Sequence, residues 1–266
     1  MLVDTHCHLT YPALFERIDA VVSRAHAAGV ERMITVATDP LDARAALPLL
    51  ERHPSLYLAA GIHPHEAAKV GDDELQALAA LHRGRWSSGP AAGRLVALGE
   101  IGLDFHYDFA PRDVQERIFR EQLSLAIEVG RPVIIHARES ESRVCAILAE
   151  YREICERTVF HCFSGGPELA KQVLDLGCWL SFTGVATFRN AGEIRAAAAA
   201  APADRIMVET DAPYLSPEPH RKVRPNEPAL VVHTARRIAD ERGTTYEAFA
   251  AQTTHNAERF FGLGAE

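Results

Sequence analysis

Residues 113–137 read DVQERIFREQLSLAIEVGRPVIIHA and contain one complete copy of the pattern on which this chain is built. The first part, Asp113–Val129, places apolar residues at helical spacing among charged ones, which predicts an amphipathic helix. Gly130 follows, where a helix C-terminal cap belongs. The run Pro132–Ala137 is almost continuously apolar, as expected of a parallel strand that is buried on both faces. This stretch therefore predicts one helix and one buried strand with His136 near its end.

The same pattern recurs along the whole chain, with helical segments such as Leu14–Ala28 and Glu139–Cys155 between short apolar runs. Eight such runs predict strands: Leu2–His6, Arg32–Ala37, Leu56–Ile62, Leu95–Ile101, Pro132–Ala137, Thr158–Cys162, Trp179–Thr183 and Ile206–Glu209. Eight β-then-α units in about 250 residues predict an α/β protein with a closed parallel (β/α)8 TIM barrel, formed as a single domain over residues 1–266. An open, doubly wound sheet is the alternative, but the chain has neither of the glycine-rich nucleotide motifs that would favour it.

Composition narrows the range of functions. The chain has 28 basic and 36 acidic residues and a net charge of −8, which argues against broad, non-specific coating of nucleic acid. The number of cysteines is five, and no CxxC motif occurs, so we expect reduced thiols and a cytoplasmic protein. No apolar run approaches the ~20 residues that span a bilayer, and the first residues lack a basic signal-peptide region. We expect no membrane contact and a monomer.

Polar residues with metal-binding side chains occur at the ends of several predicted strands. His6 and His8 are two residues apart, so their imidazoles point to one face of the first strand. The other four candidates are Glu100, His136, His161 and Asp211. Strand ends on the C-terminal face of a barrel converge on one pocket. Four histidines and two carboxylates there predict a site for two divalent ions, with Mg, Mn, Zn, Co and Ni all compatible with these ligands.

Further residues near these strand ends are candidates for substrate binding. His63 follows the third strand and either contacts substrate or is a turn histidine held by Pro64. Arg138, two residues after His136, either grips an anion or forms a salt bridge. Ser164 precedes a helix whose first amides either bind phosphate or form a plain cap.

Two irregular segments lie between the predicted elements. Gly84–Arg94 precedes the fourth strand, on the face away from the predicted site, and we interpret it as a tolerated insertion. Ala212–Pro228 follows the eighth strand and is long for a connection on the C-terminal face, which favours a functional role. The basic residues of this second loop are Arg221, Lys222 and Arg224, which either contact substrate at the predicted pocket or form a solvated cluster.

The motifs, taken together, resemble those of the TatD family of metal-dependent deoxyribonucleases, which belongs to the amidohydrolase-like metal-dependent hydrolases. The resemblance runs through nearly the whole chain. The matching motifs are DTHCHL (4–9), GIHPHE (61–66), GEIGLD (99–104), IIHAR (134–138), HCFSG (161–165), ETDAPYL (209–215), NEP (226–228) and THNAERFF (254–261). Thr10 replaces the aspartate that often follows the first motif, and the loop before the NEP motif lacks the usual glycine.

The resemblance implies a role for each candidate ligand. His6, His8 and Asp211 match the ligands of a first ion, and His136 and His161 match those of a second. Glu100 matches the carboxylate that bridges the two ions. The family's usual chemistry is hydrolysis of DNA from the 3′ end, so the resemblance implies a 3′-to-5′ exonuclease that acts on single strands or frayed 3′ ends.

We therefore expect a hydrolase that cleaves phosphodiester bonds with water activated by two ions. Asp211 is the expected proton acceptor, with Glu100 as the second catalytic residue. Two alternatives stay open. The same ligands could support hydrolysis of amides or of other esters, including an aminoacyl-tRNA ester, or they could hold a metal in a protein that recruits repair partners without catalysis.

Overall fold

The computed structural model describes residues 1–84, 92–107 and 109–263. Most of the predicted insertion at Gly84–Arg94 lies outside the described residues. The chain divides into two compact units. Unit 1 consists of Met1–Thr35, Cys162–Asp175 and Trp179–Glu266, and unit 2 consists of Val36–His161 and Leu176–Cys178. Because the single domain predicted for residues 1–266 is not tested by this division, it stays a prediction.

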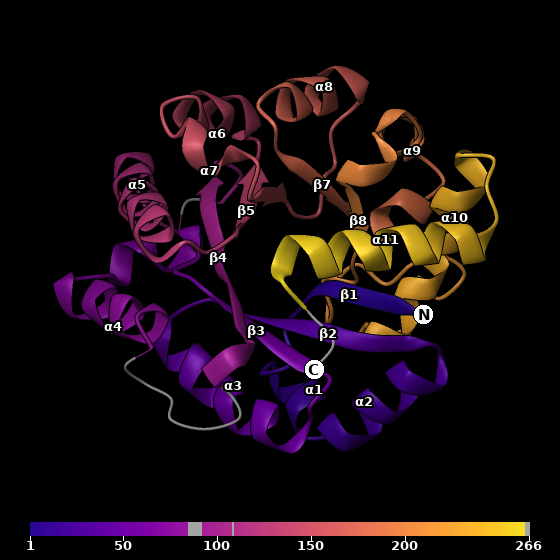
Figure 1. Ribbon diagram of the computed structural model, residues 1–266, viewed down its shortest axis with the longest axis horizontal. Coiled ribbons are helices and arrows are strands. Elements are labelled where there is room, and N and C mark those ends of the chain that lie inside the picture. The colour runs from indigo at the N-terminus through magenta and orange to yellow at the C-terminus, as the bar shows by residue number, and fades with distance from the viewer. Residues whose placement is uncertain (85–91, 108, 264–266) are drawn as a thin grey trace. The chain divides into compact units, whose positions relative to one another are not determined.

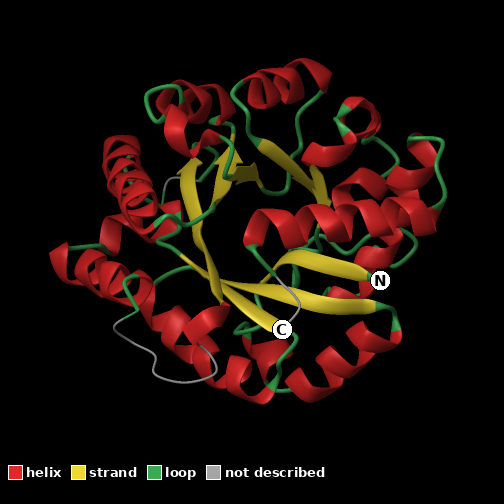
Figure 2. Cartoon of the chain, in the orientation of Figure 1, coloured by secondary structure: helices red, strands yellow, loops and turns green. Residues whose placement is uncertain are grey.

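Eight strands form one sheet in the order β1 to β8 (Figure 2). They are β1 (Leu2–Cys7), β2 (Val30–Ala37), β3 (Leu56–Ala60), β4 (Leu95–Asp104), β5 (Val133–Arg138), β6 (Thr158–Phe160), β7 (Trp179–Phe182) and β8 (Ile206–Val208). The strand pairs whose register is resolved are all parallel. A parallel bridge between Cys7 and Ala212 joins the end of β1 to the segment after β8, so the sheet closes on itself. The predicted (β/α)8 barrel fold class is confirmed.

All eight predicted strands exist, but two boundaries change the position of a candidate ligand. We expected His161 within the sixth strand, but β6 ends at Phe160 and His161 follows it. We expected the fourth strand to end at Ile101, with Glu100 at its end. The expectation is wrong, because β4 continues to Asp104 and Glu100 lies inside it. The extension pairs with β5, with Gly102 opposite His136 and Asp104 opposite Arg138. A side chain on Gly102 would overlap the carbonyl oxygen of His136, so this position requires glycine for the two strands to approach.

Helices connect the strands, and two predicted helical segments are each divided in two. The helices are α1 (Pro12–Phe15), α2 (Ile18–Ala27), α3 (Pro40–Arg52), α4 (Asp72–His82), α5 (Arg112–Val129), α6 (Glu141–Leu148), α7 (Arg152–Cys155), α8 (Pro167–Asp175), α9 (Gly192–Ala200), α10 (Val231–Glu241) and α11 (Tyr246–Phe261), with 3-10 turns η1 (Pro64–Lys69), η2 (Ala92–Arg94), η3 (Gly184–Thr187), η4 (Ala203–Arg205) and η5 (Pro228–Leu230). Arg17 (φ −125°, ψ 25°) interrupts the first segment and Tyr151 (φ −119°, ψ 45°) the other, because neither backbone is helical.

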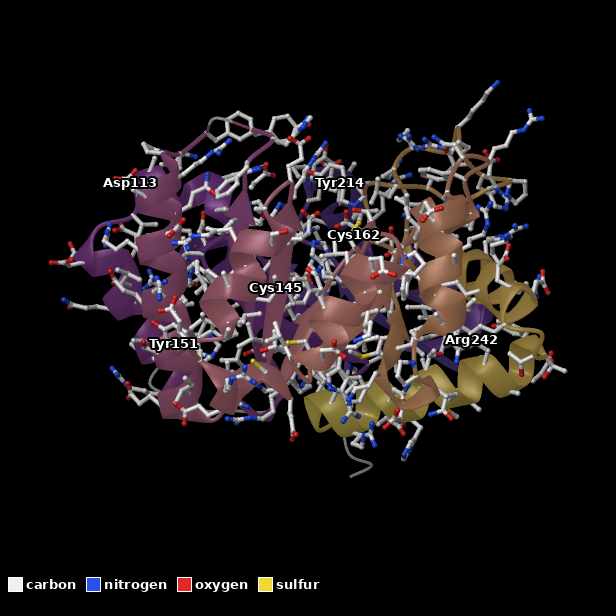
Figure 3. All side chains as sticks on the ribbon, turned by 90° about the horizontal axis from the view of Figure 1, so that it is seen from above. Asp113, Cys145, Tyr151, Cys162, Tyr214 and Arg242 are labelled. Carbon is white, nitrogen blue, oxygen red and sulfur yellow. The ribbon has the colours of Figure 1, made fainter. Side chains whose placement is uncertain are left out.

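Within unit 1, α11 packs against β1 and β8 (Figure 1). Asn256 of this helix is fully buried, and its amide nitrogen donates to the carbonyl oxygens of Ala203 (2.7 Å) and Ile206 (2.8 Å). Arg242, after α10, donates to the carbonyl oxygens of Ala198 and Ala201. In Figure 3, Arg242 lies at the other end of this unit from Tyr214. Helix-to-backbone bonds thus satisfy buried carbonyls at the amino-terminal end of β8.

Within unit 2, two buried glutamines of α5 bind the backbone at the ends of β3 and β4. Gln122 accepts from the amide of Ile62 (2.7 Å) and donates to its carbonyl oxygen (3.1 Å). Seven residues earlier in the same helix, Gln115 makes the same pair of bonds with the backbone of Asp104, at 2.8 and 3.1 Å. Because the two glutamines lie on the same face of α5, the helix fixes the position of both strand ends.

Among the described residues, no helix combines the length and the apolar character that crossing a bilayer requires.

His82, the last residue of α4, is a buried histidine that contacts the end of β3 and belongs to neither ligand group. Its Nε2 lies 2.9 Å from the carbonyl oxygen of Ala60, to which it donates. Burial, together with the charge of Arg131, lowers the pKa of His82 to about 4, although the hydrogen bond to Ala60 opposes the shift. The folded protein therefore favours the neutral form of the His82 imidazole.

We predict that His82 makes the protein less stable as the pH falls from about 6.5 to 4. Its pKa is lower in the folded than in the unfolded state, so the unfolded chain binds the proton first and acid favours unfolding. The His82→Gln variant keeps a donor to Ala60 without titrating. Denaturant unfolding of both proteins across this range should show that the wild type loses about 3 kcal/mol more. If the free energy of unfolding of the wild type and of His82→Gln changed equally with pH, the lowered pKa of His82 would be contradicted.

Candidate metal centre

In unit 1, three predicted ligands meet where β1 and β8 end. His6 Nε2 and His8 Nε2 lie 3.3 Å apart, and they lie 3.8 and 3.4 Å from Asp211 Oδ1. Backbone bonds from Asp211 N to His6 O and from His8 N to Ala212 O hold the two segments together. Asp211 has a left-handed backbone (φ 54°), a conformation that aspartate tolerates better than most residues. Two imidazole nitrogens and one carboxylate oxygen converge here, as a metal site requires.

A second carboxylate, that of Asp4, lies buried behind these ligands. It accepts hydrogen bonds from the amide (2.8 Å) and hydroxyl (2.6 Å) of Thr210 and from the amide of His6 (3.3 Å). Burial raises the pKa of Asp4 to about 8, although the bonds from Thr210 oppose the shift. Asp4 therefore ties the backbone beside one ligand, His6, to the backbone beside another, Asp211.

In unit 2, the predicted ligands Glu100, His136 and His161 form a second group. Oε1 of Glu100 lies 2.6 Å from His136 Nδ1 and 2.7 Å from His161 Nε2. The carboxylate is buried, with 3% of its side chain exposed, so it needs charged or polar partners. Two histidine nitrogens around one carboxylate oxygen are a donor set that suits a divalent transition metal.

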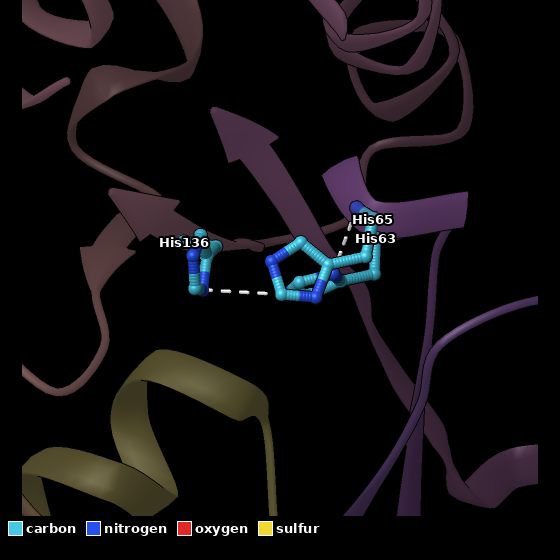
Figure 4. A group of neighbouring side chains, drawn as sticks. All are labelled: His63, His65 and His136. Atoms are coloured by element: carbon cyan, nitrogen blue, oxygen red, sulfur yellow. Dashed lines mark hydrogen bonds between the residues drawn. The ribbon is translucent and has the colours of Figure 1, made fainter. Parts of the chain in front are cut away.

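His63, His65 and His136 form a neighbouring cluster (Figure 4). His63 Nε2 lies 3.3 Å from His136 Nδ1 and 3.5 Å from Glu100 Oε1, and its Nδ1 accepts from the amide of His65. Burial lowers the pKa of His63 to about 4, which outweighs the attraction of Glu100. His63 is therefore a neutral side chain in direct contact with the second ligand group.

Asp104, like His65 and Asp4, is a residue of the site that the sequence analysis did not single out. Its Oδ2 accepts from His136 Nε2 (3.0 Å) and from His65 Nε2 (2.8 Å). Burial raises the pKa of Asp104, but the bonds from His136 and His65 outweigh burial and hold it well below its usual range. A carboxylate that accepts the Nε2 proton of His136 leaves the Nδ1 lone pair for a cation. The sequence did contain a signal for this residue, because Asp104 is the last residue of the GEIGLD motif (99–104).

The pKa of His136 reflects the same arrangement. Burial lowers the pKa, but the charge of Glu100 and the hydrogen bond to Asp104 outweigh it, so the pKa lies above its usual value. Without a cation, two carboxylates thus favour a proton on this imidazole. A bound divalent cation would take the place of that proton on Nδ1.

The predicted substrate-binding residues have varied surroundings. Arg138 is exposed, and its guanidinium lies 4.7 Å from the centroid of the Tyr107 ring. Ser164 is exposed between β6 and α8. In the loop after β8, Arg221 lies 3.5 Å from the ring centroid of Phe188, and Lys222 is exposed.

Arg224 differs from these residues because its guanidinium makes hydrogen bonds within its own loop. It donates to the hydroxyl of Ser216 and to the carbonyl oxygens of Arg221 and Val223. Its role in DNA binding stays a prediction, and the structure gives it a second role in shaping the loop.

Comparison with known proteins identifies the family. The model of the TatD related DNase family matches residues 3–262. The chain belongs to the TatD family. The metal-dependent hydrolase YabD of Bacillus subtilis is 37% identical to it over 99% of this chain and 100% of YabD. The 3′-5′ ssDNA/RNA exonuclease TatD of Enterobacter lignolyticus is 35% identical over 98% of this chain and 99% of the relative.

A solved structure agrees with this membership. The TatD homologue YJJV of Escherichia coli superimposes with a TM-score of 0.90 at 30% identity, over 99% of this chain and 98% of that one. The predicted resemblance to the TatD family is confirmed. This member is a metal-dependent hydrolase, and the predicted enzyme class is confirmed as well.

We predict that Asp104→Asn weakens metal binding. The amide retains the size of the carboxylate but replaces one acceptor oxygen with an NH2 donor, so it cannot accept from both imidazoles and both backbone amides at once. We expect His136 to lose the contact that directs its Nδ1 lone pair at a cation. Loss of such a partner typically costs 10- to 100-fold in metal affinity. Calorimetric titration with Zn²⁺ and Mn²⁺ measures the change. Asp73→Asn, an exposed carboxylate of the same unit, is the control, and equal affinities for both variants would show that Asp104 has no such role.

Proposed function

We propose that the chain is a metal-dependent deoxyribonuclease that removes nucleotides from the 3′ end of single-stranded or frayed DNA and acts as a monomer. The observation that carries the proposal is the buried group of Glu100, His136 and His161, which sets two imidazole nitrogens within 2.7 Å of one carboxylate oxygen. Membership in a family of DNases and a relative named as a 3′-5′ ssDNA/RNA exonuclease support a nucleic acid as the substrate.

Two divalent ions fit the donors that the chain provides. One would bind His6, His8 and Asp211, and the other would bind Glu100, His136 and His161. Sharing of Glu100 between both ions stays a prediction. When bound, such ions lower the pKa of water towards ~7 and offset negative charge on the phosphate oxygens.

The chain's own residues position the substrate and move the proton. Asp211 is the proposed acceptor of the proton that the attacking water loses, because its carboxylate is partly exposed and adjoins two imidazoles. His63 and Arg138 are the proposed donors to phosphate. The hydrogen bond from His136 to Asp104 keeps the imidazole oriented during the reaction.

The deciding experiment compares substrates. Purified protein is incubated with 3′- and 5′-labelled single-stranded and duplex DNA, and with ester and amide substrates, in Mg²⁺, Mn²⁺, Zn²⁺, Co²⁺ or Ni²⁺. We expect single nucleotides to be released from the 3′ end of single strands. Turnover of an amide or an aminoacyl ester without cleavage of DNA would favour the alternative hydrolase.

We predict that the two ligand groups lose metal independently. His6→Ala should reduce the metal content mainly at the first site and His136→Ala mainly at the second, so each variant should lose about one ion per chain. Activity should fall far more than stability, because the catalytic face of such a fold is separate from its core. Elemental analysis and thermal unfolding measure both effects, with the exposed His26→Ala as the control. A His136→Ala variant that unfolds with its full metal content would contradict the assignment.

We also predict a shallow salt dependence of DNA binding. A chain of net charge −8 attracts DNA only where cations and a few basic side chains lie. Contact with two to four phosphates gives a slope of about −1.5 to −3 in log K against log salt for single strands. Binding of a phosphorothioate strand at several salt concentrations measures the slope. Lys222→Ala should reduce it by less than one unit, whereas Lys171→Ala should leave it unchanged, and a steep slope would indicate an extended DNA track instead.

A further inference from the structure

Two aromatic side chains of unit 2 are exposed beside the second ligand group. Tyr107 is 39% exposed and Phe109 is 59% exposed, although rings of this size are usually buried. Their ring centroids lie 5.3 Å apart with the planes inclined by only 19°, so the two rings are stacked. Each ring therefore covers part of the other, and the remaining aromatic surface is exposed, more of it on Phe109 than on Tyr107.

The pair contacts the site through His65. The ring of His65 lies 4.7 Å from that of Phe109 and 5.5 Å from that of Tyr107, in edge-to-face geometry in both cases. His65 in turn donates to Asp104, the carboxylate that accepts from His136. The ring of His65 also lies 6.0 Å from that of His136, so His65 joins the aromatic surface directly to a metal-ligand candidate.

The backbone of this segment is also fixed to Asp104. The amides of His106 and Tyr107 donate to Asp104 Oδ1 at 2.9 and 3.0 Å. Gln115 of α5 binds the backbone amide of Asp104 itself. The side chain of Tyr107 thus extends from a backbone position that the site already holds, and a ligand would not have to order that position on binding.

Arg138 adds a positive charge to this surface. Its guanidinium lies 4.7 Å from the centroid of the Tyr107 ring and is exposed. Exposed aromatic surface beside a cation matches a nucleotide, in which a planar base lies next to a phosphate. A purely aliphatic or acidic ligand would match only one of these two features.

We propose that Tyr107 and Phe109 form a stacking subsite for one unpaired nucleobase of the nucleic-acid substrate, with Arg138 facing the adjoining phosphodiester. This inference rests on the proposed nuclease function and adds the position at which a base is held. Because every base has a π-face, the subsite tolerates any sequence. It requires a base that is free to leave its partner, which favours single strands and frayed ends.

The test compares an oligonucleotide that carries bases with an oligomer that has none. The metal-loaded protein is assayed with hexathymidylate and with an oligomer of the same length in which tetrahydrofuran spacers replace all nucleosides. Loss of one base–aromatic stacking contact corresponds to a change of about 5- to 150-fold. We expect KM for the spacer oligomer to exceed KM for hexathymidylate by at least about fivefold in the wild type.

Variants at Phe109 assign this difference to the aromatic surface. Phe109→Ala should raise KM for hexathymidylate at least about fivefold with little change in kcat, and leave KM for the spacer oligomer unchanged. Phe109→Leu should behave like the alanine variant and Phe109→Trp like the wild type, because only tryptophan retains an aromatic face. A merely structural role would alter both substrates equally.

Tyr151→Ala is the matched control, since Arg120 lies over its ring at 6.0 Å. In Figure 3, Tyr151 lies at the opposite end of unit 2 from Asp113, which follows Phe109 by four residues. Equal KM values for both oligomers in the wild type, or an unchanged KM for hexathymidylate in Phe109→Ala, would overturn the subsite and leave the nuclease intact. If the protein cleaves neither oligomer, the proposed nuclease function is overturned as well.

Discussion

A buried carboxylate is costly unless hydrogen bonds satisfy it, and the arrangement of unit 2 around Asp104 follows from that requirement. Two imidazoles, from His65 and His136, donate to one of its oxygens, and two backbone amides donate to the other. The same residue thereby sets the tautomer of a metal-ligand candidate and the course of the chain after β4. Gln115 completes the arrangement, because it binds the backbone of Asp104 from the adjacent helix.

Unit 1 also contains a buried carboxylate, but its hydrogen-bond donors are of a different kind. Asp4 is also a buried carboxylate, but hydroxyl and amide donors satisfy it rather than imidazoles. The two carboxylates accordingly differ in ionisation, since the pKa of Asp4 is raised and that of Asp104 is lowered. Neutral donors stabilise a carboxylate less than imidazoles that can carry a proton, and burial then decides the direction of the shift.

The sequence was sufficient for the fold class because apolar runs of β-branched residues and helical periodicity report directly on burial. It also located six candidate ligands, because a histidine or carboxylate within or after an apolar run stands out. It could not show that β4 continues past Ile101, since Gly102 and Asp104 look like turn residues until their pairing with β5 is known. It could not show that Asp104 serves His136, because that contact joins residues 32 apart.

The predicted substrate residues show a further limit of sequence reasoning. The sequence of a basic loop does not distinguish side chains that contact a ligand from side chains that bond to the backbone of their own loop. Arg224 bonds to its own loop, and Arg221 packs on Phe188, a ring that is 33 positions earlier in the chain. Only spatial neighbours separate these roles, and neither spacing nor composition contains that information.

The bond between Asp4 and Thr210 spans 206 positions of the chain, and it has a consequence for biosynthesis. A ribosome adds about 5–20 residues per second, so β1 emerges roughly 10–40 s before the residues that satisfy its carboxylate. Before Thr210 is made, burial of the Asp4 carboxylate would leave it without the hydroxyl and amide that satisfy it, and such burial is costly. Asp4, which joins β1 to the segment after β8, therefore makes burial of the first strand more favourable once the last strand has been made.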